Sequence, residues 1–361
     1  MNLLPLIRRS IPHGEIDVKQ CLKFSDSVHE SMDTGREKNE SVSLDTLILA
    51  SMTNSYVEGC SQLTGTCGQT VRNHLRNKDP DLLLQINHDL MATIREKGML
   101  KKPLIVAMDW HDEMYYGDLG TEGIIGTKNN RGTNYAYEYA SVSIVVKGIR
   151  FVIAVIPVHE RTVVNMVSSL ISIIHSNGMV IRLLLLDGGF YSIDAIRLLH
   201  SSGVKYIMHA PKLKSVCKDQ EIDRNHTTGS HNRRKSQQAT FRIVSIYGRN
   251  AKGRLLYIFA TNTPFPPKEV LRFFKKRWGI ETGYRMIRKF LAKTTSRIYR
   301  IRLLYFYFAI LLYNFWVLLN LMRGNRIIAD VLRAYITSSL IKTNPFTTNL
   351  YLENSPSGGG F

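Results

Sequence analysis

Apolar and polar positions follow two different periods along this chain. Through the first 100 residues the apolar positions recur at helical spacing, as in 43–59 and 81–98, and no run resembles a strand. From Lys101 onward, short apolar runs bounded by turn residues replace this pattern, beginning with 103–110. The sequence therefore predicts a helical N-terminal region followed by a β-rich domain.

Strand-like and helical runs after residue 101 come in a defined order. Three strand-like runs come first, and helices then alternate with two more strands, which predicts an α/β fold with a mixed sheet and flanking helices. The strands are expected at 103–110, 135–148, 149–159, 181–190 and 205–211, and the helices at 161–178 and 192–203.

The remaining segments set the expected domain boundaries. A polar stretch at 212–238 holds seven Lys or Arg residues, and with the two strand-like runs after it predicts a basic, β-containing insertion at about 212–262. Prolines then introduce a long basic helix. We expect a helical region at 1–100, an α/β domain at 101–322 and a C-terminal tail at 323–361, of which the last residues, 355–361, are flexible.

The run 303–322 is apolar and long enough to cross a membrane. It also contains Asn314, Asn320 and four Tyr or Trp residues, which favours a buried core helix over a membrane span. We therefore expect no membrane association.

The charge of the chain indicates a polyanionic partner. Lys and Arg total 48 against 29 Asp and Glu, a formal net charge of +19, which attracts DNA or RNA; a basic surface that serves only solubility is the alternative. The cysteines form no Cys-x-x-Cys pair, and Cys217, His226 and His231 match no common zinc spacing. With no signal segment at the start, we expect a reducing, cytoplasmic location.

Residues 46–76 contain a possible helix-turn-helix. A short apolar helix and a Gly-containing turn precede a second helix that carries Gln69 and Arg72, side chains suited to reading DNA. An ordinary pair of packed helices gives the same pattern, and both interpretations stay open.

Two aspartates follow apolar strands of the predicted sheet. Asp109 ends the first strand, and Asp187 ends the strand after the first crossover helix. Carboxyl ends of neighbouring strands meet at one sheet edge, where sites form, although a strand-end aspartate also caps turns. Asp112, Glu113 and Asp118 are possible rivals to Asp109, and we expect them in a solvated turn.

A third carboxylate stands out by its surroundings. Between Arg272 and Arg302 there are eleven Lys or Arg residues and one acid, Glu281, which shares a helical stripe with Arg277. A surface ion pair of Glu281 with Arg277 and Arg285 is the structural alternative. Three carboxylates without a nucleophilic Ser or Cys constellation suggest metal chemistry, with two Mg²⁺ or Mn²⁺ ions.

The stretch around Glu281 resembles the DDE transposases of prokaryotic insertion sequences. It is most similar to the insertion-sequence-4 type group, marked by Tyr-x2-Arg-x3-Glu-x6-Lys. Arg277 and Glu281 match this signature, whereas Phe274 stands in place of Tyr and Arg288 in place of Lys. The strands that end in Asp109 and Asp187 resemble those that carry the two aspartates of the family.

The resemblance implies an RNase H-like catalytic domain at 101–322 and a DNA-binding region at 1–100. It implies a metal-dependent enzyme that cleaves DNA at transposon ends and joins the 3′-hydroxyl to target DNA. A homodimer would hold two terminal inverted repeats in a synaptic complex at the nucleoid. Metal ligands would be Asp109, Asp187 and Glu281, and DNA contacts would come from Arg277, Arg288, Arg285, Lys276, Gln69 and Arg72.

Two other functions agree with the same residues. An RNase H-like nuclease would share the metal chemistry without strand transfer. A helix-turn-helix regulator, or an inactive transposase copy, would bind DNA without cleaving it, although a regulator does not require the three carboxylates.

Overall fold

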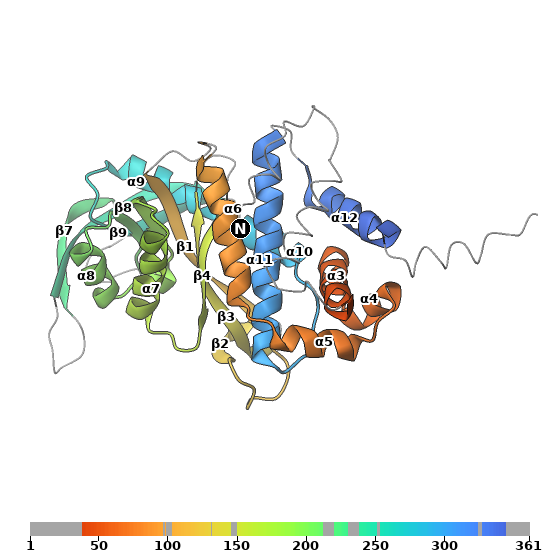
Figure 1. Ribbon diagram of the computed structural model, residues 1–361. Helices are drawn as coiled ribbons and strands as arrows, with labels where there is room; N and C mark the ends of the chain where they lie inside the picture. Colours follow the sequence, from red (N-terminus) through yellow and green to blue (C-terminus); the bar gives the residue numbers. More distant parts are fainter. Residues whose placement is uncertain are drawn as a thin grey trace, which may run out of the picture. The chain divides into compact units, whose positions relative to one another are not determined.

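The computed structural model describes residues 38–96, 98, 103–130, 132–145, 150–211, 220–229, 238–250, 253–323 and 327–343. These residues form two compact units (Figure 1). The helical unit comprises the described parts of Met1–Met99, Gly120–Glu122 and Tyr284–Phe361, and the sheet unit those of Leu100–Leu119 and Gly123–Gly283. Residues from Tyr284 onward thus group with the N-terminal helices, although the sequence suggested a domain running to 322.

The sheet unit begins with an antiparallel meander. Its strands are β1 (Leu104–Met114), β2 (Ile125–Asn130), β3 (Thr133–Ile144) and β4 (Val152–Val158). One edge of β3 pairs with β1, and the other edge pairs with β2 near its start and with β4 along Glu138–Ser143. Residues of β3 from Ala136 onward are buried, because this strand lies inside the sheet.

Two βα units continue the sheet with parallel strands. After α7 (Val163–Ser176), β5 (Ile181–Leu186) pairs parallel to β1; after α8 (Ile193–Ser201), β6 (Tyr206–His209) pairs parallel to β5. The helices α7 and α8 lie side by side on one face of the sheet (Figure 1). The predicted α/β fold, a mixed sheet with flanking helices, is confirmed. The predicted order is wrong in one respect, because four strands and not three precede α7; β2 was not expected.

Three further strands extend the sheet from β6. They are β7 (Ile222–Gly229), β8 (Gln238–Asn250) and β9 (Gly253–Thr261), joined in the order β6-β9-β8-β7. The strand β7 lies in the polar stretch 212–238, where no strand-like run was identified; it is an edge strand that Arg242 of β8 holds by two 2.6 Å bonds to Asp223. Cys217 and His231 lie outside the described residues.

The helices α8 and α9 (Pro267–Lys275) pack on opposite faces of this extension. Tyr191, just before α8, contacts Phe241 of β8 edge to face. Phe274 of α9 contacts Phe259, which is registered opposite Val244 of β8. Positions 241 and 244 are three apart on a strand, so their side chains point to opposite faces.

The long basic helix predicted after Pro266 is broken in two. The helix α9 ends at Lys275, a 3₁₀ turn η2 covers Lys276–Trp278, and α10 runs over Gly279–Lys289. Arg277 lies in η2 and Glu281 in α10, so the two residues do not belong to one continuous α-helix, as the spacing argument had assumed.

The helical unit contains α3 (Lys38–Thr53), α4 (Val57–Thr64), α5 (Gly68–Asn77), α6 (Asp81–Glu96), α11 (Tyr299–Arg323) and α12 (Ala329–Thr343). The N-terminal helical region is thus present. Residues 329–343, within the expected C-terminal tail, form α12.

The helix α11 meets the length and hydropathy of a membrane span over Tyr299–Leu321, but 89% of that window is buried inside the protein. Its polar residues have partners within the chain: Asn314 donates to Asn87 of α6 at 2.5 Å, and Asn320 accepts the Ile327 N–H at 2.6 Å. A core helix satisfies polar groups in this way, so the predicted buried helix is confirmed.

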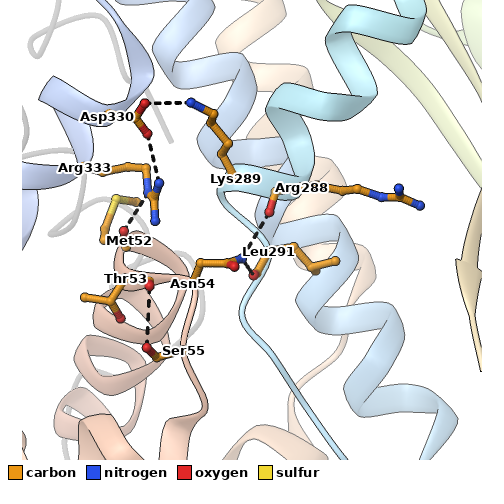
Figure 2. A network of polar contacts seen from close by, with 9 residues as sticks. All are labelled: Met52, Thr53, Asn54, Ser55, Arg288, Lys289, Leu291, Asp330 and Arg333. Carbon is orange, nitrogen blue, oxygen red and sulfur yellow. Dashed lines mark hydrogen bonds and ion pairs between the residues drawn. The ribbon is translucent and has the colours of Figure 1, made fainter.

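The ends of three helices meet in a polar network (Figure 2). Asn54, which follows α3, donates to the backbone oxygens of Arg288 and Leu291 at the end of α10. Arg333 of α12 donates to the Met52 oxygen at 2.6 Å, and Asp330 accepts from both Arg333 and Lys289. These bonds satisfy carbonyls that helix ends leave without intrahelical donors.

Candidate active site

Three parallel strands place three polar side chains in one row. Met108 of β1 is registered with Leu186 of β5, and Leu186 with Met208 of β6. The next residue on each strand is Asp109, Asp187 and His209. Because parallel strands keep their register, these residues lie side by side at the carboxyl edge of the β5 and β6 strands.

Asp109 lies within its strand, whereas the sequence suggested that it ends it. The strand β1 continues to Met114, paired with β3, and only its pairing with β5 stops at Met108. Asp109 is therefore held by β3 on one side and faces the open edge beyond β5 on the other. This explains why its side chain is only 11% exposed while that of Asp187 is 40% exposed.

The guanidinium of Arg277 joins the two aspartates. Its Nη1 lies 3.1 Å from Asp109 Oδ2 and its Nη2 3.3 Å from Asp187 Oδ1. The second oxygen of Asp109 accepts the Trp110 backbone N–H at 2.9 Å. Arg277 is itself buried, with a side chain 6% exposed, so this is an ion pair largely removed from solvent.

An aromatic cluster packs against Arg277. The Arg277 Cζ lies 5.4 Å from the ring centroid of Phe274, a cation–π distance. Phe274 in turn stacks on His209 at 5.9 Å and contacts Phe259 at 4.9 Å. The 3₁₀ turn after α9 is what turns Arg277 toward the strand ends while Phe274 stays in the core.

The two glycines after Asp187 have a packing reason. A Cβ on Gly188 would lie 3.0 Å from His209 Nδ1, and a Cβ on Gly189 would lie 2.9 Å from Trp110 Nε1. Trp110 stacks on Phe190 with centroids 4.4 Å apart. The backbone after β5 therefore passes close to two rings, which keeps Asp187 at the sheet edge.

Two residues of this site were not identified from the sequence, His209 and Trp110. The only signal for His209 was its place at the end of a strand-like run, the same signal used for the aspartates. Burial lowers the pKa of His209, the Asp187 charge opposes this and the Arg277 charge adds to it. His209 is thus neutral at neutral pH.

The rival acids of β1 are engaged elsewhere. The solvated turn expected for Asp112 and Glu113 is wrong, because both lie in β1; only Asp118 follows the strand and is exposed. Glu113 pairs with His111 at 2.5 Å. Asp112 is registered opposite buried Glu138 and accepts from Thr127 at 3.2 Å.

The remaining predicted residues are not all brought to the two aspartates. Glu281 is the third residue of α10, and its side chain lies outside what the structure describes. Lys276 is exposed, with its Nζ 5.0 Å from the Phe273 ring centroid. Arg285 and Arg288 belong to the helical unit, where Arg285 is exposed and Arg288 is half-buried.

The predicted helix-turn-helix corresponds to α4 and α5, joined by Gly65 in the left-handed region at φ 69°. Arg72 of α5 donates to Gln69 at 2.6 Å and pairs with Glu58 of α4. Gln69 is exposed, so its side chain is accessible, whereas Arg72 is half-buried.

Among the described side chains, no group of three His, Cys, Asp or Glu residues is arranged to hold a metal. Asp109 and Asp187 both contact Arg277, and their carboxylate oxygens are the hard donors that Mg²⁺ and Mn²⁺ prefer. The donor chemistry of the pair fits a divalent ion, with Glu281 as the sequence's candidate for a third ligand.

Comparisons with known proteins identify a family and a similar fold. A family model described as "Transposase DDE domain" matches residues 123–315, more than half of the 361-residue chain, and begins after Asp109. No curated protein matches the chain. A solved structure described as "Cryo-EM structure of piggyBac transposase synaptic complex with hairpin DNA" is similar in fold: the TM-score is 0.56 at 10% identity, covering 99% of this chain and 82% of that one.

Proposed function

This chain belongs to the transposase DDE domain family, and from this premise we propose that it cleaves DNA at transposon ends and joins them to target DNA. The observation that carries the proposal is the pairing of Asp109 and Asp187 on neighbouring parallel strands, both in contact with one buried arginine. Two aspartates on neighbouring strands repel each other, which lowers the stability of the fold. A purely structural role therefore does not explain why both are present.

We propose that Asp109, Asp187 and Glu281 hold two divalent ions, Mg²⁺ or Mn²⁺. Such ions, when bound, activate the attacking oxygen and stabilise the leaving oxygen of a phosphodiester. The chain's own part is to fix the carboxylates: β3 pairs with Asp109, and the close-packed backbone at Gly188 and Gly189 holds Asp187.

The basic residues of the chain bind the DNA. Near Glu281 in the sequence we propose four DNA-contacting residues: Lys276 and Arg277 in η2, and Arg285 and Arg288 in α10. Two more, Gln69 and Arg72, lie on α5, in the region we propose reads the terminal inverted repeats. The net charge of +19 supplies the nonspecific attraction.

The biological setting follows from the same premise. The solved relative is a synaptic complex with hairpin DNA, and we propose that this chain also acts as a homodimer on two DNA ends. The Arg277 and Glu281 spacing favours the insertion-sequence-4 type group, and we propose a prokaryotic cytoplasm, at the nucleoid, as the location of the enzyme.

The test is cleavage and joining of a labelled duplex that carries the terminal sequence of the element, in Mg²⁺, in Mn²⁺ or with EDTA. Wild type is compared with Asp187→Asn and Glu281→Gln, and with Asp194→Asn, an exposed aspartate of α8, as control. We expect metal-dependent nicking and joining that both site variants lose and the control keeps.

Each other outcome has its own meaning. Nicking without joining would indicate a nuclease, and binding without nicking in any metal would indicate a regulator or an inactive copy. Nicking that persists in Glu281→Gln would show that the third carboxylate is a different residue.

A further inference from the structure

The buried guanidinium of Arg277 contacts both carboxylates of the site, and its positive charge reduces their mutual repulsion. Its two Nη atoms contact different residues, Asp109 at 3.1 Å and Asp187 at 3.3 Å, so a single planar group spans both strands. Without it, two carboxylates would stand side by side at a sheet edge, one of them nearly buried, and repel each other.

The same oxygens are those that a bridging divalent ion would use. Asp109 Oδ1 already accepts the Trp110 N–H, and Asp109 Oδ2 accepts from Arg277. A divalent ion held by both aspartates would compete with the guanidinium, since both cations would be attracted to the oxygens that Arg277 contacts, Asp109 Oδ2 and Asp187 Oδ1.

From this geometry we infer that Arg277 substitutes for a divalent ion in the metal-free protein, and that metal loading exchanges its contacts with Asp109 and Asp187 for metal–oxygen bonds. This cation exchange rests on the proposed function and adds a regulatory step to it. Arg277 keeps the carboxylates assembled before loading, and the guanidinium released on loading is then available to a DNA phosphate.

The cation exchange and a merely supporting role of Arg277 predict opposite changes in metal affinity when Arg277 is replaced. If Arg277 only supports the carboxylates, neutralising it disorders the site and weakens metal binding. If Arg277 competes with the metal, Arg277→Gln removes the competitor, so the protein loses stability in EDTA but binds the first Mn²⁺ about tenfold more tightly.

The experiment measures Mn²⁺ binding to the full chain by electron paramagnetic resonance of the free ion, and thermal unfolding with EDTA or Mn²⁺. The variants are Arg277→Gln and Arg277→Lys, with Arg272→Gln, 65% exposed on α9, as the matched control. Lysine keeps the charge but cannot bond both aspartates as a fork, so its Mn²⁺ affinity should lie between those of wild type and Arg277→Gln.

The expected result is the affinity order Arg277→Gln, Arg277→Lys, wild type, with the largest Mn²⁺-induced rise in unfolding temperature in Arg277→Gln. If Arg277→Gln does not fold in either condition, the comparison of Arg277→Lys with wild type decides. Affinity that is equal or highest in wild type overturns the exchange.

Asp187→Asn separates this inference from the proposed function. Mn²⁺ binding that Asp187→Asn abolishes, without a gain in either Arg277 variant, overturns the exchange and leaves the proposed metal site intact. Absence of Mn²⁺ binding in wild type and in both Arg277 variants overturns both.

Discussion

Gly189 and Trp110 are packed so closely that a Cβ on Gly189 would lie 2.9 Å from the indole Nε1. The Trp110 ring is stacked on Phe190 and has little room to move away. We therefore expect Gly189→Ala to displace the ring or the backbone after Asp187, at a cost of about 1–3 kcal/mol of unfolding free energy. Urea unfolding and near-ultraviolet circular dichroism of the tryptophans would measure both effects.

Gly59→Ala is the matched control for this substitution. Gly59 lies within α4, and a Cβ there would meet no heavy atom within 4 Å. Alanine should be neutral there, or stabilising by up to about 1 kcal/mol. Equal stability of Gly189→Ala and wild type would show that the close approach to Trp110 is relieved at no cost.

Asp109 and Asp187 should differ in what they contribute to folding. Asp109→Asn takes a charge from a nearly buried pair with Arg277, so we expect a loss of about 3 kcal/mol. Asp187 is 40% exposed and solvent screens its pairing, so Asp187→Asn should cost at most about 1 kcal/mol. Urea unfolding in EDTA tests this asymmetry. Equal costs would mean that burial does not distinguish the two pairings with Arg277.

Much of the sheet could be predicted from the sequence, because each core strand is a separate apolar run bounded by turn residues. The sequence interpretation took the strands of Asp109 and Asp187 as neighbours with their carboxyl ends at one sheet edge, and the parallel pairing of β1 with β5 agrees with it. The strand β7 could not be predicted, because an edge strand with few buried residues lacks the apolar pattern from which strands are predicted.

The site was predicted less completely, for a physical reason. The break between α9 and α10 depends on backbone geometry at Lys276–Trp278, and no proline or glycine precedes Gly279 to mark it. The roles of His209 and Trp110 depend on register between strands far apart in sequence, which composition does not encode.

Glu138 should make stability depend on pH. Burial raises the pKa of its carboxyl, Arg161 at 2.8 Å lowers it, and the Asp112 charge raises it further. A raised pKa means that the folded state favours the protonated form, so this contribution is present in acid and is lost as pH rises through the folded-state pKa.

Glu138→Gln should therefore gain stability relative to wild type as pH rises from about 4 to 7. Arg161 is 44% exposed and remains solvated after the change. Thermal unfolding across this range tests the prediction, with exposed Glu160→Gln as control for the loss of one carboxylate. A difference between Glu138→Gln and wild type that does not vary with pH would contradict it.

Asn54 combines two properties at the end of α3. Among the described residues it is the one non-glycine residue with positive φ, at 52°. Its amide donates to the Leu291 oxygen at 2.7 Å and to the Arg288 oxygen at 3.2 Å (Figure 2). Asparagine tolerates the left-handed region better than most residues, so it supplies both the turn and the donor.

Substitutions at Asn54 should separate these two contributions. Asn54→Gly keeps the backbone conformation and loses the two bonds, at about 1–2 kcal/mol; Asn54→Ala adds the left-handed penalty of about 1 kcal/mol. Asn54→Asp is expected to cost most, because a carboxylate would face two carbonyl oxygens in place of the donor. Urea unfolding of the three variants should give the stability order Gly, Ala, Asp. If Asn54→Asp proved as stable as Asn54→Gly, the amide would not bind the end of α10 in solution, and the positive φ alone would account for asparagine at this position.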